Sequence, residues 1–335
     1  MTVRVGINGF GRIGRNLFRA ATQAGADIEF VAVNDLGSLE TMAHLLKYDS
    51  VLGTLPEDIK ATKNGIKVGT SELKVLSERD PKQLPWGELG VDVVVESTGI
   101  FTSRDKAAAH LAAGAPLVVV SAPSSGADAT FVYGVNHKDF DPKKQQVVSA
   151  ASCTTNCFVP LVKVLDDAFG VVNGLMTTVH AYTGDQSLVD GPHSDLRRAR
   201  AAAINIVPTS TGAARATSLV MESMKGKLDG TALRVPVPTG SLTDFTANLR
   251  RKASVDEINE AYAAAAKKEL KGVLRYSDEP LVSSDIVTDP HSCVFDSGLT
   301  MSMGKMVKVN GWYDNEWGYS NRLVDFVVYA GSKKR

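Results

Sequence analysis

The chain has 335 residues, and at roughly 150 residues per domain this length predicts about two domains. Lys and Arg together number 37, as do Asp and Glu, so the net charge is zero and argues against a protein that holds nucleic acid or a membrane surface by bulk charge. Hydrophobic residues make up 44% and charged residues 22%, which is typical of globular proteins and excludes global disorder.

The cysteine count and the N-terminal sequence indicate the compartment. Three cysteines, an odd number in a chain of this length, argue against a disulfide framework and leave the thiols free for chemistry. The N-terminus enters a strand pattern at once, without the apolar core of a signal peptide. Uncharged stretches such as residues 111–127 are interrupted by Gly, Pro and Ser, so we expect no membrane span and a cytoplasmic protein.

Short apolar runs alternate with helical patterns over the first 150 residues. Strands are predicted at residues 3–7, 28–33, 91–95, 117–120 and 146–149. Helices are predicted at residues 12–23 and, in an Ala-rich segment, at residues 104–113. The β-branched runs are typical of strands buried on both faces, and the β-α-β-α-β order predicts an α/β fold with a doubly wound parallel sheet.

After Ser149 the pattern changes. Helices are predicted at residues 154–169, 255–270 and 320–329, the last with Leu323, Phe326, Val327 and Ala330 on one face. Strands are predicted at residues 174–180, 233–237, 242–249 and 307–312. Because these strands are not each followed by a helix, we expect a second, α+β domain with a mixed or antiparallel sheet.

A glycine pattern follows the first predicted strand. Gly9, Gly11 and Gly14 fit G-x-G-x-x-G between a strand and a helix, where glycines allow a tight turn, approach of a pyrophosphate and close helix packing. Asp35 ends the second strand at the separation from which a carboxylate reaches a ribose diol, and Leu36 leaves no cation for a 2′-phosphate. The pattern therefore predicts a Rossmann domain that binds NAD. The alternatives are a glycine-rich turn with an unrelated Asp, and a basic loop elsewhere that restores NADP.

Cys153 lies where an apolar strand meets a predicted helix. The positive end of the helix dipole favours a thiolate there, so we expect a lowered thiol pKa and a nucleophile. Cys157 is expected to be a small buried hydrophobe. The alternatives for Cys153 are a buried inert thiol and a zinc site, and the zinc site lacks ligands because Cys293 is the only other cysteine. No metal is expected.

A base and a set of phosphate ligands follow. His180 ends a predicted strand that leads into a long polar loop, and is the expected base; the other five histidines are expected to be structural or exposed. Thr183, three arginines at residues 197, 198 and 200, the hydroxyl run at 209–211 and Arg234 within an apolar strand predict a small phosphorylated substrate. Salt bridges at a subunit interface remain the alternative for the clustered arginines.

Seven segments together resemble one family, in collinear order and over essentially the whole chain. They are residues 7–15, 152–157, 180–183, 195–200, 208–212, 233–236 and 312–316, and the run Ser-Cys-Thr-Thr-Asn-Cys among them is highly specific. The chain resembles phosphorylating, NAD-dependent glyceraldehyde-3-phosphate dehydrogenases. The resemblance implies oxidative phosphorylation of D-glyceraldehyde 3-phosphate to 1,3-bisphosphoglycerate, with inorganic phosphate and through a thioester on Cys153.

The resemblance also implies roles for single residues. His180 would hold an ion pair with Cys153 and remove the hydroxyl proton. Substrate and attacking phosphate would be bound by Ser152, Thr154, Thr183, Arg198, Thr211, Gly212 and Arg234. The cofactor would be bound by Gly9, Gly11, Arg12, Ile13, Gly14, Asp35, Arg79, Ser121 and Asn315. The implied domains are residues 1–151 for NAD, 152–318 for catalysis, and a C-terminal helix at 319–335 that returns to the first domain.

The resemblance also bears on how copies of the chain assemble. The resemblance implies a homotetramer in which the loop at 183–204 packs between subunits, with no nucleic acid and no membrane as partner. Two departures from the family, the lysine-free loop at 123–127 and Gly191 beside Pro192, affect the expected cofactor affinity and loop packing. The rival interpretations are an erythrose-4-phosphate dehydrogenase and a non-catalytic NAD-binding or RNA-binding protein.

Overall fold

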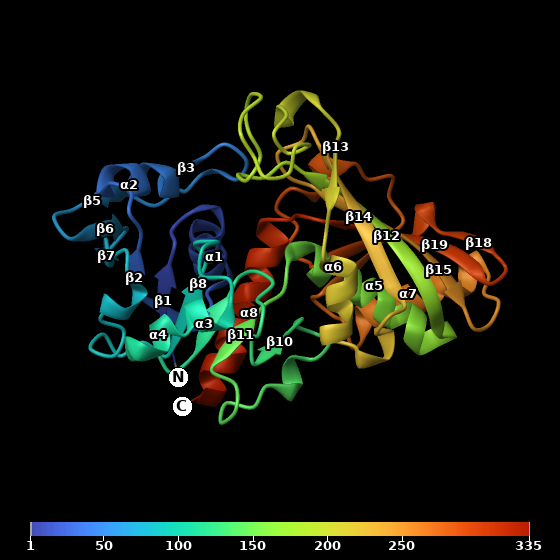
Figure 1. The fold of residues 1–335 in the computed structure, drawn as a ribbon, viewed down its shortest axis with the longest axis horizontal. Helices are drawn as coiled ribbons and strands as arrows, with labels where there is room; N and C mark the ends of the chain where they lie inside the picture. The colour runs from blue at the N-terminus through green and yellow to red at the C-terminus, as the bar shows by residue number, and fades with distance from the viewer. Residues whose placement is uncertain (1, 335) are drawn as a thin grey trace. The chain divides into compact units, whose positions relative to one another are not determined.

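Two large β-sheets organise the chain, one in each of two units (Figure 1). The computed structural model describes residues 2–334. The first unit contains the described residues up to Phe131, together with His137–Ala151 and the chain from Leu323 on. The second contains Val132–Asn136 and Ser152–Arg322.

The sheet of the first unit is parallel over most of its width. Its strands, in spatial order, are β10 (Ala129–Thr130), β11 (Val147–Ser149), β9 (Val118–Val120), β8 (Val93–Glu96), β1 (Val3–Asn8), β2 (Ile28–Asn34), β7 (Ser71–Leu76), β6 (Gly65–Val68) and β5 (Ile59–Ala61). All neighbouring strands from β10 to β7 pair in parallel, and only the pairs β7–β6 and β6–β5 are antiparallel. Strand order reverses at β1, between β2 and β8, which is the switch point where such sheets bind ligands. The predicted doubly wound sheet is confirmed.

The helices of the first unit differ from the prediction in one place. They are α1 (Arg12–Ala24), α2 (Leu39–Lys47), α3 (Arg104–Ala107) and α4 (Ala109–Ala112), and a small hairpin joins β3 (Tyr48–Asp49) to β4 (Gly53–Thr54). The single helix predicted at 104–113 is two short helices, because the chain tightens after Ala108, where the N–H of Leu111 bonds to the Ala108 carbonyl at 3.0 Å. His110 then accepts a 3.0 Å hydrogen bond from the buried Trp86 indole.

The sheet of the second unit is mixed. Its strands, in spatial order, are β13 (Val207–Ser210), β14 (Leu228–Val235), β12 (Val171–Ala181), β15 (Ser241–Leu249), β19 (Met306–Tyr313), β17 (Cys293–Asp296) and β16 (Leu274–Ser277), with β18 (Met301–Met303) paired to β19. β12 with β14 and β16 with β17 are parallel, and the other pairs are antiparallel. This confirms the predicted α+β character.

Helix α5 provides the core beneath this sheet. The helices here are α5 (Cys153–Phe169), α6 (Ala213–Ala216) and α7 (Val255–Lys267), whereas α8 (Trp317–Lys334) begins in this unit and belongs to the first unit from Leu323 on. Short 3₁₀ turns lie at Pro81–Gln83 and His137–Asp139 in the first unit, and at Ala202–Ile204, Thr217–Leu219, Glu222–Met224, Ser283–Ile286 and Ser297–Leu299 in the second. The Phe158 ring of α5 packs edge-on against Phe245, with ring centroids 4.8 Å apart. Tyr262 stacks on Phe295 at 3.8 Å and donates to the Leu161 carbonyl at 2.6 Å, which fixes α7 against α5. None of the helices in the described part of the chain combines the length and the apolar character that a membrane crossing needs.

Candidate active site

The start of α5 places Cys153. Ser152 is the N-cap, and its hydroxyl accepts a hydrogen bond from the Thr155 backbone N–H at 3.0 Å. Ala151, just before it, has φ of +58°, a left-handed conformation that a residue with a Cβ adopts at a cost. The sharp turn that this conformation creates lets the chain leave a strand and begin a helix within a few residues, with Cys153 in the first helical position.

His180 faces the thiol from strand β12. Its Nε2 lies 3.5 Å from the Cys153 sulfur, and the residue is buried. Its Nδ1 lies 2.7 Å from the Ala181 carbonyl oxygen, and in the tautomer with the proton on Nδ1 the Nε2 lone pair is directed at Cys153. In the other tautomer Nδ1 accepts a hydrogen bond from Arg234, and Nε2–H is directed at the sulfur. The register of β12 and β14 pairs His180 with Arg234, whose Nη1 is 2.6 Å from the same Nδ1 and donates to Ala181 at 3.0 Å.

Burial governs the charge state of this pair. Burial, and next the Arg234 cation, lower the pKa of His180 to about 3. Burial raises the pKa of the Cys153 thiol, although Arg234 and hydrogen bonds with Thr154 act in the opposite direction. Both shifts favour the neutral forms of the thiol and the imidazole, and the direction for Cys153 is opposite to the lowering expected from the helix terminus, because burial outweighs it.

Tyr313 supports both partners and was missed from the sequence. Its hydroxyl lies 2.8 Å from the hydroxyls of Thr154 and of Thr178, which come from α5 and β12. Its ring packs edge-on against the His180 imidazole, with centroids 5.9 Å apart. Tyr313 lies in the motif at 312–316 that was used to predict Asn315 as a cofactor ligand. That motif was the sequence signal from which Tyr313 could have been found.

Asn315 is oriented by hydroxyl groups. Its Oδ1 accepts from Ser241 at 2.9 Å and from Thr239 at 3.3 Å, so the amide nitrogen points away from these donors. The turn that carries Asn315 is held by the Asp314 carboxylate, which accepts from the backbone N–H groups of Thr288, Glu316 and Trp317 at 2.8–2.9 Å. Asn315 is buried and well fixed, and can present N–H donors to a planar amide.

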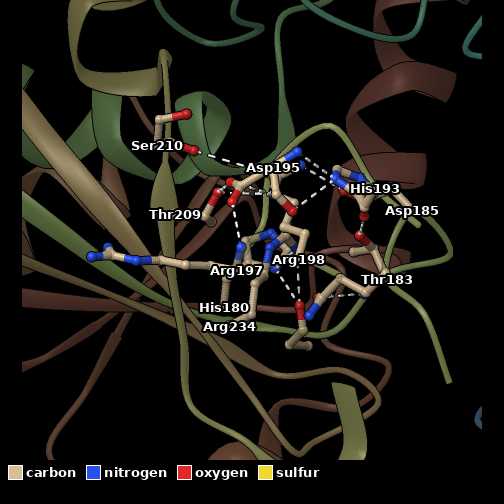
Figure 2. Close-up of polar contacts among 12 residues, drawn as sticks. His180, Thr183, Asp185, His193, Asp195, Arg197, Arg198, Thr209, Ser210 and Arg234 are labelled. Carbon is tan, nitrogen blue, oxygen red and sulfur yellow. Dashed lines mark hydrogen bonds and ion pairs between the residues drawn. The ribbon is translucent and has the colours of Figure 1, made fainter. Parts of the chain in front are cut away.

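Arg198 is the centre of a second polar cluster (Figure 2). On one side its Nη1 donates to Asp185 at 2.6 Å, and Asp185 also accepts from the Thr183 hydroxyl. On the other side its Nε donates to the Thr209 hydroxyl at 2.8 Å, and Thr209 donates to Asp195 at 2.8 Å. The structure thus brings together the predicted Thr183 and Arg198, and adds two carboxylates that the sequence reasoning did not include.

Two other predicted substrate ligands lie at the start of α6. Thr211 accepts a hydrogen bond from the Ala213 N–H at 3.2 Å, and Gly212 immediately precedes the helix. Their segment follows β13, which pairs with β14, the strand of Arg234. Among the described residues, no group of three or more His, Cys, Asp or Glu side chains is arranged to hold a metal ion.

The three glycines of the G-x-G-x-x-G pattern have three different surroundings. Gly9 has φ of +95°, and a Cβ there would lie 2.6 Å from the Thr98 backbone nitrogen. A Cβ on Gly14 would lie 2.2 Å from the Gly9 carbonyl oxygen, whereas one on Gly11 would meet no protein atom within 4 Å. Gly9 and Gly14 are therefore required by the protein's own packing, and Gly11 keeps open the space beside the N-terminus of α1, where a pyrophosphate fits.

A hollow of about 440 Å³ adjoins this loop. It is lined by Asn8, Gly9, Gly11, Asn34, Asp35, Leu36, Glu78, Arg79, Ser97, Thr98, Ile100 and Phe101. The Asp35 carboxylate accepts from the N–H groups of Phe10 and Gly37 at 2.7 and 3.0 Å, which holds it at the rim. The hollow thus lies at the glycine loop and includes four predicted residues; Ser97, Thr98, Ile100 and Phe101 were missed because they carry no motif.

The remaining predicted cofactor residues lie outside that lining. α1 begins at Arg12, so the backbone N–H groups of Arg12, Ile13 and Gly14 lie in the first turn, where a helix can offer donors to an anion. The Arg12 side chain forms an ion pair with Asp49. Ser121 immediately follows β9 and bonds through its N–H to the Glu96 carbonyl at 2.9 Å.

Comparison with known proteins gives the same result for both units. Residues 3–104 match the family described as glyceraldehyde 3-phosphate dehydrogenase, NAD binding domain, and residues 152–315 match its C-terminal domain. A glyceraldehyde-3-phosphate dehydrogenase of Mycobacterium avium is 63% identical over 337 residues, covering 99% of each chain. Glyceraldehyde-3-phosphate dehydrogenase 2 of Streptomyces arenae is 62% identical over 332 residues, also covering 99% of each. The enzyme of Streptomyces coelicolor is 61% identical over 335 residues, covering 99% of this chain and all of its own.

Proposed function

The chain belongs to the glyceraldehyde-3-phosphate dehydrogenase family of NAD-dependent oxidoreductases, and we propose that it oxidises and phosphorylates D-glyceraldehyde 3-phosphate through a thioester on Cys153. The family, the fold and the cofactor expected from the motifs are confirmed. The observation that carries the proposed chemistry is the 3.5 Å approach of the Cys153 sulfur to Nε2 of His180 at the head of α5.

The first step is addition of Cys153 to the aldehyde. The sulfur bonds to the carbonyl carbon while Nε2 of His180 takes the thiol proton and passes it to the carbonyl oxygen, giving a hemithioacetal. Tyr313, bonded to Thr154 and Thr178, positions the two reacting side chains.

Oxidation follows at the same carbon. NAD supplies the hydride acceptor when it is bound. As the hemithioacetal loses its hydride, His180 takes the hydroxyl proton, and the carbon becomes the carbonyl of a thioester. Asn315, whose oxygen is occupied by Ser241 and Thr239, would direct its N–H donors to the nicotinamide amide.

Phosphate then releases the acyl group. An oxygen of inorganic phosphate attacks the thioester carbon, the bond to sulfur breaks, and the Cys153 thiolate recovers a proton from His180. We assign the substrate's own phosphate to Thr183 and Arg234 and the attacking phosphate to Ser152, Thr154, Thr211 and Gly212. Arg198 lies between the two. The guanidinium and hydroxyl groups of this set are suited to phosphate oxygens.

The units divide these tasks. We assign residues 1–151 to NAD, residues 152–318 to catalysis, and residues 319–335 to a helix that returns to the NAD-binding domain. Within the first part, the cofactor ligands are Gly9, Gly11, Arg12, Ile13, Gly14, Asp35, Arg79 and Ser121. The open space at Gly11 and the rim carboxylate of Asp35 support this assignment.

We further propose a cytoplasmic homotetramer. Large apolar side chains stand exposed along the segment that precedes β13, among them Leu188 at 81% and Leu196 at 82%, with Ile204 and Ile206 beyond them. Such an apolar surface on one chain favours burial against another copy. The three free cysteines support a reducing compartment. A solution mass near four times 35.7 kDa is the expected result.

An assay with single omissions tests the proposed activity. The purified protein is mixed with glyceraldehyde 3-phosphate, NAD and inorganic phosphate, and NADH is followed by its absorbance while each component is left out in turn. We expect sustained NADH formation only with all three. Much faster turnover of erythrose 4-phosphate would instead identify an erythrose-4-phosphate dehydrogenase, and NAD binding without hydride transfer would identify a non-catalytic protein.

A further inference from the structure

Asp185 occupies one donor assigned to the substrate's phosphate, Thr183, and a second, Arg198, that is assigned a place between the two phosphates. One of its carboxylate oxygens accepts from the Thr183 hydroxyl, and the other accepts from Nη1 of Arg198 at 2.6 Å (Figure 2). The two oxygens of one carboxylate therefore bridge two donors that come from either end of the loop between β12 and β13. A phosphate offers the same donors a pair of oxygens in a similar arrangement.

The surroundings keep Asp185 charged. Burial would raise the pKa of its carboxyl, but the Thr183 hydroxyl and the cations of Arg234 and Arg198 together hold that pKa below its ordinary value. The Asp185 side chain is 39% exposed, so it can leave the cluster for solvent without breaking the core. Arg198 is held from its other side by Thr209, and this contact does not depend on Asp185.

We propose that the Asp185 carboxylate is a built-in competitor of the substrate's phosphate group and thereby sets the affinity of the enzyme for phosphorylated ligands. This inference rests on the proposed function, which assigns Thr183, Arg198 and Arg234 to phosphate. A phosphate must displace Asp185 from Arg198 and Thr183, and it is then repelled by the displaced carboxylate nearby. Asp185 touches no reacting atom and acts through the two residues that it holds.

The test is Asp185→Asn, which keeps an acceptor for Thr183 but removes the charge. Binding of inorganic phosphate is measured by calorimetry, without NAD or aldehyde. We expect the dissociation constant to fall roughly fivefold, the size that a partly exposed ion pair can account for. The KM for glyceraldehyde 3-phosphate should fall with it, by a larger factor than any change in kcat. A merely structural role would weaken binding instead.

Matched variants isolate the charge and the position. Asp190→Asn makes the same substitution in the same loop, at a carboxylate paired with Arg200 at 2.8 Å, and should leave phosphate binding unchanged. Asp185→Glu keeps the charge and should resemble the wild type. Thermal unfolding verifies the fold of each variant, and Asp185→Ala replaces Asp185→Asn if that variant does not fold.

The outcomes separate this inference from the proposed function. The competitor role is overturned if Asp185→Asn binds phosphate no more tightly than the wild type. It is also overturned if Asp190→Asn gains as much phosphate affinity as Asp185→Asn. Both conclusions hold even if the wild-type enzyme is fully active. Failure of the wild type to reduce NAD with glyceraldehyde 3-phosphate overturns the proposed activity, and the phosphate titration still decides whether Asp185 competes for the site.

Discussion

The two units build their sites from different parts of the polypeptide. In the first, the part of the site that carries the motif is mostly backbone: three glycines, the N-terminus of α1 and one carboxylate, all within Gly9 to Asp35, while Arg79 and Ser121 come from later in the chain. In the second, it is made of side chains distant in sequence; Thr154 and Tyr313, whose hydroxyls are 2.8 Å apart, are separated by 159 positions. A site whose residues are close in sequence can be recognised as a motif, whereas a site whose residues are far apart in sequence depends on strand register and packing.

The electrostatics of the units differ in the same way. Asp35 sits at an open rim and is held by backbone N–H groups. His180 is buried and Cys153 is half-buried, and burial moves the pKa of each toward its neutral form. The carboxylate that would recognise the cofactor is thus held by backbone N–H groups, whereas burial controls the charge of the two groups that would exchange a proton.

The largest expected effect is that of Cys153→Ser. A hydroxyl of serine is far less acidic and less nucleophilic than a thiol, so the rate of aldehyde oxidation should fall by roughly 10³-fold or more. The dissociation constant for NAD, measured by calorimetry, should stay within about twofold, because all the assigned cofactor ligands except Asn315 lie in the other unit. Oxidation at the wild-type rate would exclude Cys153 as the nucleophile.

The glycine loop offers a matched pair of substitutions with the next largest effect. In Gly14→Ala the new Cβ would lie 2.2 Å from the Gly9 carbonyl oxygen, so the chain must shift and the free energy of unfolding should fall by about 1–3 kcal/mol. In Gly11→Ala the Cβ meets no protein atom, so stability should be unchanged while NAD affinity falls about tenfold. Urea unfolding and NAD titration measure both effects. Equal destabilisation by the two variants would contradict the distinction between packing and cofactor space.

The sequence was sufficient for the parts of the fold that follow from local patterns. Periodicity predicted β1, β2, β8, β9 and β11 of the parallel sheet and α5, and the glycine spacing marked the start of α1. It did not predict β5, β6 and β7, whose exposed residues lack an apolar run, nor the break between α3 and α4. That break depends on contacts outside the segment, such as the bond from Trp86 to His110.

The candidate site shows the same limit at the level of single residues. Cys153, His180 and Arg234 each had a local signal, and β12 and β14 pair in a register that brings His180 beside Arg234. Tyr313 and Asp185 act only through partners that the fold supplies. The direction of the Cys153 pKa was predicted wrongly because a helix terminus is visible in the sequence, whereas burial of the thiol is a property of the folded chain.

The last expected effect is a pH dependence of stability, and it tests how burial acts on His180. The pKa of His180 is lowered by burial, and next by Arg234, to about 3, while the unfolded chain should have the ordinary value of about 6.5. Between these values only the unfolded chain binds the proton, so stability is lost as the pH falls below about 6.5. From pH 7 to pH 5 this loss is about 2 kcal/mol. The free energy of unfolding is measured with urea at both pH values in the wild type and in His180→Asn. Its fall from pH 7 to pH 5 should be smaller by this amount in His180→Asn, in which the other histidines still titrate. Equal drops in the two proteins would mean that the pKa of His180 in the folded chain equals its value in the unfolded chain, and burial would then not lower it.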